Sequence, residues 1–267
     1  MAEKTDMVLL VDMGNTSIRW GWLDKAQVRP GQETLPALQD PGSALHRAHA
    51  LEELLDECWS GLPVPDQVWL ASVAPDELSR AVTTWIDRQW ACKTHQATSQ
   101  SESDGVCNAY TEPQRLGVDR WLSLLATRRH TDKPCCVIDC GSAITFDVLM
   151  SSGQHRGGHI LPGLQMMRDT LYQQASGVTF TRAADDTLTL FTSNTEDAVA
   201  AGSLYAVVAY IERVVNDLEQ ELAETTKCLI TGGDAGTLQS LVSIDVEFCP
   251  NLVLQGLAVY GQQAGWL

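Results

Sequence analysis

Basic side chains are scarce in this sequence. Eighteen Lys and Arg stand against 34 Asp and Glu, which leaves a formal net charge of -16 over 267 residues. Such a field repels nucleic acid phosphates and anionic membrane surfaces, so we expect no nucleic acid partner, and an anionic substrate must meet local positive groups. Apolar residues make up 44% and charged residues 19%, which is typical of a globular protein.

Long apolar runs are also lacking near the first residue. The segment MAEKTDMVLLVDMGNTS holds an apolar run of only five residues before Asp12, too short for a signal peptide or a membrane span. The sequence therefore predicts a cytoplasmic protein with no membrane partner. Its eight cysteines form no Cys-x-x-Cys pair and no zinc-site spacing, so reduced and mostly buried thiols are predicted.

Two common nucleotide-binding motifs are missing as well. The chain contains no Gly-Lys dipeptide, which excludes a Walker-type phosphate loop, and no Gly-x-Gly-x-x-Gly follows a predicted strand. What occurs instead is an apolar strand that ends in Asp-x-Gly, then a hydroxyl or amide residue and a second strand. This pattern lies at residues 7–23 and again at residues 134–150, and a third glycine turn follows a short strand at residues 228–234. The repeat predicts two duplicated halves.

The first Asp-x-Gly turn has the residue types of a phosphate site. Glycine allows a tight backbone turn, which leaves amides and short polar side chains to face a phosphate, and Asp12 at the strand end could position Mg2+. A plain hairpin turn is the alternative, but the recurrence at Asp139–Asp147 favours the phosphate interpretation. The candidate residues are Asp12, Met13, Gly14, Asn15, Thr16, Ser17, Ile18 and Arg19.

Helices are predicted between these turns. Pro75–Glu77 is typical of a first helical turn and should open a helix that runs to about Trp90. An apolar stripe at helical spacing predicts a long core helix over residues 196–224. Residues 96–106 are polar and are expected to form an exposed loop, with the lobe boundary close behind it. The predicted lobes are residues 1–115 and 116–267.

Two further segments carry candidate chemistry. In Leu116–Trp121 an acid and a base stand side by side, which alone is usually a surface turn or a helix cap. With phosphate turns in both halves, Asp119 is a candidate to accept or orient a substrate hydroxyl proton, and Arg120 to hold an anionic group. Residues 155–163 combine two histidines with three glycines and Pro162, which argues against a metal-binding helix and predicts a shaped loop that lines a cleft.

Taken in order, these motifs resemble those of type III pantothenate kinases. Four segments carry the resemblance: Asp12–Thr16 as Asp-x-Gly-Asn-Thr, Gly117–Arg120 as Gly-x-Asp-Arg, Asp139–Ala143 as Asp-x-Gly-Thr-Ala, and Gly157–Gly163 as Gly-Gly-x-Ile-x-Pro-Gly. The match continues to Asn194–Thr195. Ser142 stands where the family commonly has Thr and Arg19 where Lys is frequent, so phosphate geometry around residue 19 could differ.

The resemblance implies an α/β protein of the acetate and sugar kinase, heat-shock chaperone and actin superfamily. That fold is two-lobed, actin-like (ribonuclease H-like) and duplicated, with a central mixed sheet in each lobe and a nucleotide cleft between them. It also implies ATP as phosphoryl donor, pantothenate as acceptor in the first step of coenzyme A synthesis, a divalent cation such as Mg2+, a monovalent cation (K+ or NH4+) and a homodimer.

The resemblance also assigns roles by position. Asp12–Arg19 and Ser142 would bind ATP, Asp119 would be the proton acceptor and Asp139 would bind potassium. The residues that would contact pantothenate are Tyr110, Gly117, Val118, Asp119, Arg120 and Thr195.

Two other functions stay open at this point. One is a regulatory, transcriptional accessory relative of the same fold that has lost catalysis; the intact Asp12, Asp119, Arg120 and Asp139 and the acidic charge argue against it. The other is an actin-like kinase or phosphatase for a different small molecule, because phosphate turns indicate a nucleotide and not the acceptor.

Overall fold

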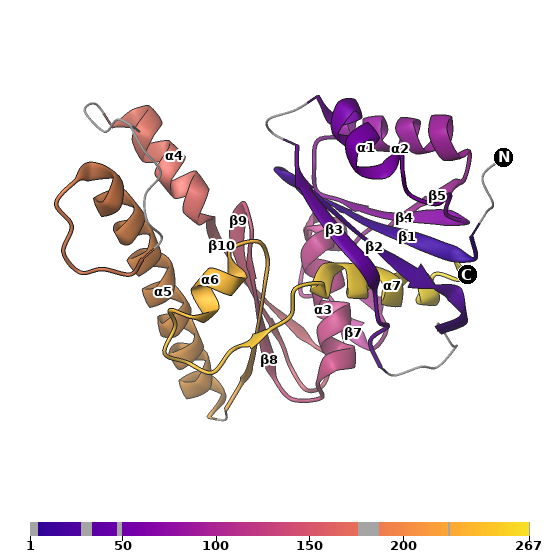
Figure 1. Ribbon diagram of the computed structural model, residues 1–267. Helices are drawn as coiled ribbons and strands as arrows, with labels where there is room; N and C mark the ends of the chain where they lie inside the picture. The colour runs from indigo at the N-terminus through magenta and orange to yellow at the C-terminus, as the bar shows by residue number, and fades with distance from the viewer. Residues whose placement is uncertain (1–4, 28–33, 47–49, 176–186, 224, 267) are drawn as a thin grey trace. The chain divides into compact units, whose positions relative to one another are not determined.

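The computed structural model describes residues 5–27, 34–46, 50–175, 187–223 and 225–266 (Figure 1). Contacts between residues divide the chain into two compact units, and each is described by itself. Unit 1 comprises residues 1–132, 152–157 and 251–267, and unit 2 comprises residues 133–151 and 158–250. The predicted lobes 1–115 and 116–267 follow the sequence repeat rather than these contacts, so that division, like the cleft between the lobes, stays a prediction.

Unit 1 is built on a five-stranded mixed sheet with the order β3-β2-β1-β4-β5. Its strands are β1 (Met7–Met13), β2 (Ser17–Asp24), β3 (Gln39–Leu45), β4 (Gln67–Ser72) and β5 (Lys93–Gln96). β2 is antiparallel to both of its neighbours, β1 and β3, whereas β1, β4 and β5 run parallel. The carboxyl ends of β1 and β4 therefore meet at one edge of the sheet.

Helices cover both faces of this sheet. Figure 1 shows α1 (Leu51–Trp59) and α2 (Asp76–Trp90) on one face, and α3 (Val118–His130) and α7 (Leu252–Gln263) on the other. Under α1 and α2 the ring of Trp59 lies 5.6 to 5.8 Å from the rings of Trp20, Trp85 and Trp90. On the other face, a Cβ at Gly256 would strike the backbone of Leu122 in α3, so α7 packs closely against α3.

Unit 2 repeats the same sheet, with the order β10-β9-β8-β11-β12. Its elements are β8 (Cys135–Cys140), β9 (Ala143–Leu149), β10 (His155–Pro162), α4 (Leu164–Gln174), α5 (Thr195–Leu222), β11 (Lys227–Thr231), α6 (Ala235–Gln239) and β12 (Glu247–Phe248). The first three residues of β10, 155–157, group with unit 1. As in unit 1, the first two strands are antiparallel, and the first strand runs parallel to the fourth. This matched topology confirms the predicted duplicated α/β fold with a mixed sheet in each half.

The predicted helices are present. α2 begins directly after Pro75 and ends at Trp90, as its acidic first turn indicated. α5 covers nearly all of the predicted residues 196–224, of which residue 224 lies outside the described part of the chain. By length and composition α5 could cross a membrane, but its stripe of Leu204, Val207 and Ile211 is buried in the core of unit 2. It is the core helix that the stripe predicted.

One loop prediction was wrong and a second holds only in part. Residues 155–162 form β10 rather than a loop, because Gly158 lets the strand approach the backbone of Phe146 so closely that a Cβ would not fit. The segment expected to be an exposed loop contains a small hairpin of β6 (Glu102–Ser103) and β7 (Val106–Cys107). Within it Ser99 is buried, and its hydroxyl donates a hydrogen bond to the Leu116 carbonyl (2.8 Å). Short 3-10 turns lie at Lys25–Gln27 and Pro113–Arg115.

Candidate active site

The first Asp-x-Gly turn joins β1 to β2 at the carboxyl edge of the unit 1 sheet. Asp12 and Arg19 are direct partners in the antiparallel register, and the Gly14 N–H donates to the Ser17 carbonyl (2.9 Å). The turn between them presents Asn15 to solvent, while Asp12 and Arg19 are half-buried. A tight turn with polar side chains at the carboxyl ends of parallel strands is typical of ligand sites in α/β sheets.

His46, which follows β3, makes two hydrogen bonds to this turn. Its backbone N–H donates to the Thr16 carbonyl (3.0 Å), and its Nε2 lies 3.0 Å from the Gly14 carbonyl oxygen, so Nε2 is the donor. The side chain is buried. Sequence reasoning missed this residue, because His46 lies far from the turn along the chain and stands in no motif.

The start of α3 lies at the same edge. The Val73 N–H donates to the Met13 carbonyl (3.0 Å), and a Cβ at Gly117 would be 3.8 Å from the Val73 side chain. Residue 73 therefore links the end of β1 to the residue that precedes α3. The same Cβ would lie 2.5 Å from Asp119 Oδ1, so glycine at position 117 leaves room for this carboxylate.

Asp119 occupies the first turn of α3. Its Oδ1 accepts the N–H of Arg120 at 2.7 Å, and the N-terminal end of a helix carries partial positive charge that stabilises a carboxylate. Asp119 is half-buried, at the edge to which the Asp12 turn belongs. The structure thus brings these two predicted site residues to one side of unit 1.

Arg120 and Tyr110 form a pair. Arg120 Nη1 donates to the Tyr110 hydroxyl at 3.0 Å, and the guanidinium carbon lies 5.8 Å from the centre of the Tyr110 ring. Only 5% of Arg120 is exposed. The Tyr110 N–H donates to Asn108 Oδ1 (3.0 Å), which fixes the backbone at the ring. In a protein of net charge -16, this buried cation is a local positive group of the kind that an anionic substrate requires.

The second Asp-x-Gly turn, in unit 2, lies between two other glycine turns. The Gly163 N–H donates to the Ser142 carbonyl (3.1 Å), and the Asp234 N–H donates to the Cys140 carbonyl (2.9 Å). A Cβ at Gly232 would lie 2.5 Å from Asp139 Oδ1, and a Cβ at Gly163 would strike the backbone of Ser142. The third glycine turn predicted from the sequence thus packs directly on the turn that holds Asp139.

The electrostatics of this turn keep its thiol protonated. Burial first, and then the charges of Asp139 and Asp234, raise the pKa of the Cys140 thiol. Cys140 is therefore no nucleophile, and the chemistry available at the turn belongs to the Asp139 carboxylate, the Ser142 hydroxyl and backbone groups. Oxygen donors of this kind suit hard cations, and the glycine at position 232 lets the third glycine turn approach the carboxylate closely.

Thr195 is the first residue of α5 and belongs to unit 2. Beside it Asn194 caps the helix, since its Oδ1 accepts the Asp197 N–H at 2.9 Å. Thr195 lines a pocket of about 730 Å³ between α4 and α5, with Met167 and Leu171 on its apolar side. Of the predicted acceptor-binding residues, unit 1 holds Tyr110, Gly117, Val118, Asp119 and Arg120 together, and unit 2 holds Thr195.

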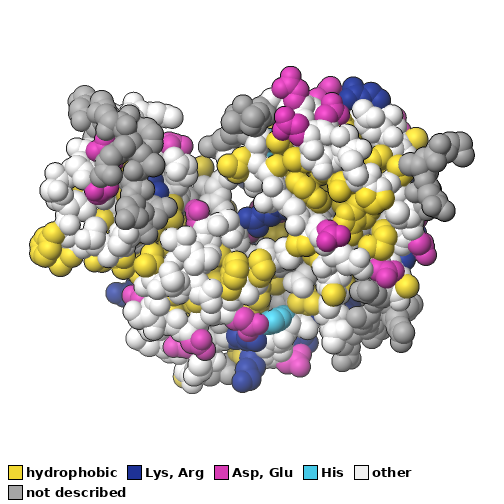
Figure 2. All heavy atoms as spheres, viewed as in Figure 1, with side chains coloured by type: hydrophobic (Ala, Val, Ile, Leu, Met, Phe, Trp, Pro, Cys, Tyr) yellow, Lys and Arg dark blue, Asp and Glu magenta, His cyan; other side chains and the backbone are white. Residues whose placement is uncertain are grey.

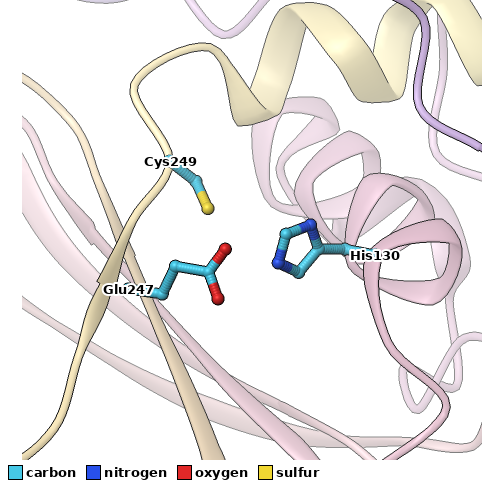
Figure 3. Close-up of side chains that lie close together, drawn as sticks. All are labelled: His130, Glu247 and Cys249. Atoms are coloured by element: carbon cyan, nitrogen blue, oxygen red, sulfur yellow. The ribbon is translucent and has the colours of Figure 1, made fainter.

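One further group of side chains resembles a metal ligand set. Figure 3 shows Glu247 and Cys249 on the segment that includes β12. The carboxylate of Glu247 is paired with Lys227 Nζ at 2.9 Å, and the third labelled residue, His130, belongs to unit 1. We therefore assign no metal site to these side chains.

Comparison with known proteins identifies the chain. A model of the type III pantothenate kinase family matches residues 8–217. The chain belongs to this family. It is 37% identical over 257 residues to the type III pantothenate kinase of Nitrosococcus oceani, covering 94% of this chain and 92% of that one. It is 34% identical over 251 residues to the enzyme of Alcanivorax borkumensis, covering 94% and 97%. The predicted family resemblance is confirmed.

Solved structures agree on the fold. The ethanolamine utilization protein EutJ of Carboxydothermus hydrogenoformans superposes with a TM-score of 0.53 at 11% identity, covering 98% of this chain and 92% of that one. A Campylobacter jejuni protein described as a Baf family transcriptional activator gives 0.57 at 20% identity, covering 97% and 100%. At such identities the likeness concerns the fold alone, and the predicted actin-like α/β fold is confirmed.

Proposed function

We propose that this chain transfers the γ-phosphoryl group of ATP to the 4'-hydroxyl of pantothenate, the first step of coenzyme A synthesis. The family match over residues 8–217 carries the proposal. The geometry of unit 1 supports it, because a carboxylate, a buried arginine and a phosphate-type turn occur at one edge of its sheet. The regulatory alternative is not favoured, because the relatives from Nitrosococcus oceani and Alcanivorax borkumensis, at 37% and 34% identity, are type III pantothenate kinases by name.

In this mechanism Asp119 orients the acceptor hydroxyl and takes its proton. The carboxylate stands in the first turn of α3, where the Gly117 backbone leaves it room. Phosphoryl transfer passes through a loose transition state, so the placement of the hydroxyl in line with the phosphorus contributes more than the basicity of Asp119. Arg120, held by Tyr110, offers its guanidinium to the carboxylate of pantothenate.

ATP binds to the Asp-x-Gly turns in this proposal. The segment Asp12–Arg19 receives the phosphates, with Arg19 as its cation, and Ser142 of the second turn contacts the nucleotide. Asp12 would position a divalent cation such as Mg2+, which would supply positive charge to the phosphates. Asp139 would hold a monovalent cation, K+ or NH4+, through its carboxylate oxygens.

A homodimer and a cytoplasmic location complete the proposal. Apolar side chains are exposed on α4, on α5 and on the segment that leads into α5. Figure 2 shows hydrophobic atoms along this part of unit 2. Phe191 is 86% exposed, Leu171 44% and Tyr205 39%, and such an exposed apolar patch is typical of a subunit interface. Light scattering on the purified protein should give the mass of a dimer.

The decisive experiment is a coupled ADP-release assay with ATP, Mg2+ and pantothenate, run in K+ and then with Na+ in its place. Turnover that requires both pantothenate and K+ supports the acceptor and the monovalent cation together. Turnover with pantothenate in either salt supports the acceptor alone. Without turnover in either salt, the regulatory function or another acceptor takes the place of this proposal.

A further inference from the structure

Residues 153–155 lie alongside the segment that carries Tyr110, and both belong to unit 1. The Cys107 N–H donates to the Gly153 carbonyl (2.9 Å), and Cys107 and Gln154 form a parallel bridge. The Gln154 side chain donates to the Cys107 carbonyl (3.4 Å) and to the His155 carbonyl (2.9 Å). These bonds fix the backbone of residue 155 beside residues 107–109.

His155 is 1% exposed and reaches the next residues of that segment. The Ala109 N–H donates to His155 Nδ1 at 3.3 Å. The imidazole is also parallel to the Tyr110 ring, with 9° between the planes and 6.4 Å between the ring centres. Because Nδ1 accepts a hydrogen bond, the proton of the neutral imidazole must be on Nε2.

We propose that His155 is a positioning residue for the acceptor-binding pair Tyr110 and Arg120. It fixes the backbone at Ala109 and one side of the Tyr110 ring, and the Tyr110 hydroxyl in turn receives the Arg120 guanidinium. A chain of contacts thus runs from His155 through Tyr110 to the buried cation. The identity of the acceptor as pantothenate rests on the proposed function, whereas the positioning of Tyr110 does not.

Steady-state kinetics on four variants test this role. In His155→Ala both contacts are lost, and the KM for pantothenate should rise about 10-fold, which corresponds to about 1.4 kcal/mol or one ordinary hydrogen bond. The KM for ATP and kcat should change less than about 2-fold, which is a smaller effect than the loss of one hydrogen bond. His155→Asn keeps an acceptor near Nδ1 and should recover most of the loss, whereas His155→Phe keeps only the ring and should recover less. His95→Ala, which removes an aromatic contact with Trp266 elsewhere in unit 1, is the matched control.

Amide hydrogen exchange gives a readout that needs no turnover. The Ala109 amide should exchange slowly in the wild type and in His155→Asn, and faster in His155→Ala and His155→Phe. If the wild type lacks pantothenate kinase activity, the proposed function fails and exchange alone decides the positioning role. Equal exchange at Ala109 in wild type and His155→Ala, or an equal rise in both KM values, would overturn that role even in an active kinase.

Discussion

Replacing Gly232 with alanine tests the packing around Asp139. Gly232 has φ +100°, a backbone conformation that costs an L side chain about 1–2 kcal/mol. The added Cβ would also lie 2.5 Å from Asp139 Oδ1 and 2.5 Å from the Cys140 carbonyl group, and such overpacking costs about 1–3 kcal/mol. The two terms together predict that Gly232→Ala lowers the free energy of unfolding by about 2–5 kcal/mol.

The same substitution should change the cation response, because the Cβ displaces the proposed ligand oxygen. We expect the K+ concentration for half-maximal activity to rise at a temperature where the variant is still folded. Urea unfolding measures the stability change. The control is Gly236→Ala in α6, where an added Cβ meets none of the described atoms within 4 Å and should stabilise the helix by up to about 1 kcal/mol. A Gly232→Ala protein with wild-type unfolding and wild-type K+ activation would refute this account of the turn.

Three other results are expected. Asp119→Asn should cut turnover at least about 100-fold at unchanged melting temperature. The control Asp87→Asn, on the exposed side of α2, should have wild-type rates. Near-normal turnover of Asp119→Asn would remove Asp119 from the mechanism. His46→Phe should raise the KM for ATP several-fold, roughly the effect of one lost hydrogen bond, and leave the KM for pantothenate unchanged. His46→Gln keeps a donor for the Gly14 carbonyl and should have a smaller effect, so equal effects of both variants would contradict this prediction. Burial first, and then the charge of Glu247, raise the pKa of Cys249 from 9.0 to about 11. The Cys249 thiol therefore loses its proton at a lower pH in the unfolded chain than in the folded one, so the free energy of unfolding should fall as pH rises from 9 to 11. Urea unfolding at each pH measures this fall, which should be smaller in Cys249→Ser.

Local patterns in the sequence predicted the parts of the fold that depend on neighbouring residues. The two Asp-x-Gly segments predicted β1, β2, β8 and β9, because each pair is joined by the turn that the motif describes. Pro75 and the acids that follow it predicted where α2 begins, and the apolar stripe predicted α5. The family resemblance was confirmed by comparison, while the individual site roles remain predictions.

Parts that depend on distant contacts could not be predicted in this way. The glycines near residue 158 favoured a loop, and only the close approach to the backbone of Phe146 makes a strand of them. His46 and His155 have their partners at Gly14 and Ala109, more than 30 residues away, so their roles are visible only in three dimensions. For the same reason no local pattern indicated that residues 152–157 and 251–267 group with unit 1.

The place of α7 in unit 1 has a consequence for the order of synthesis. β1, β2 and β4 emerge from the ribosome early, but α7, which covers one of their faces together with α3, is translated after every residue of unit 2. At a synthesis rate of roughly 5–20 residues per second, α7 becomes available to this face about 10 s or more after β4 has been made. Unit 2 can therefore close while unit 1 still exposes apolar strand residues, and the half of the chain that is made first is the last to be finished.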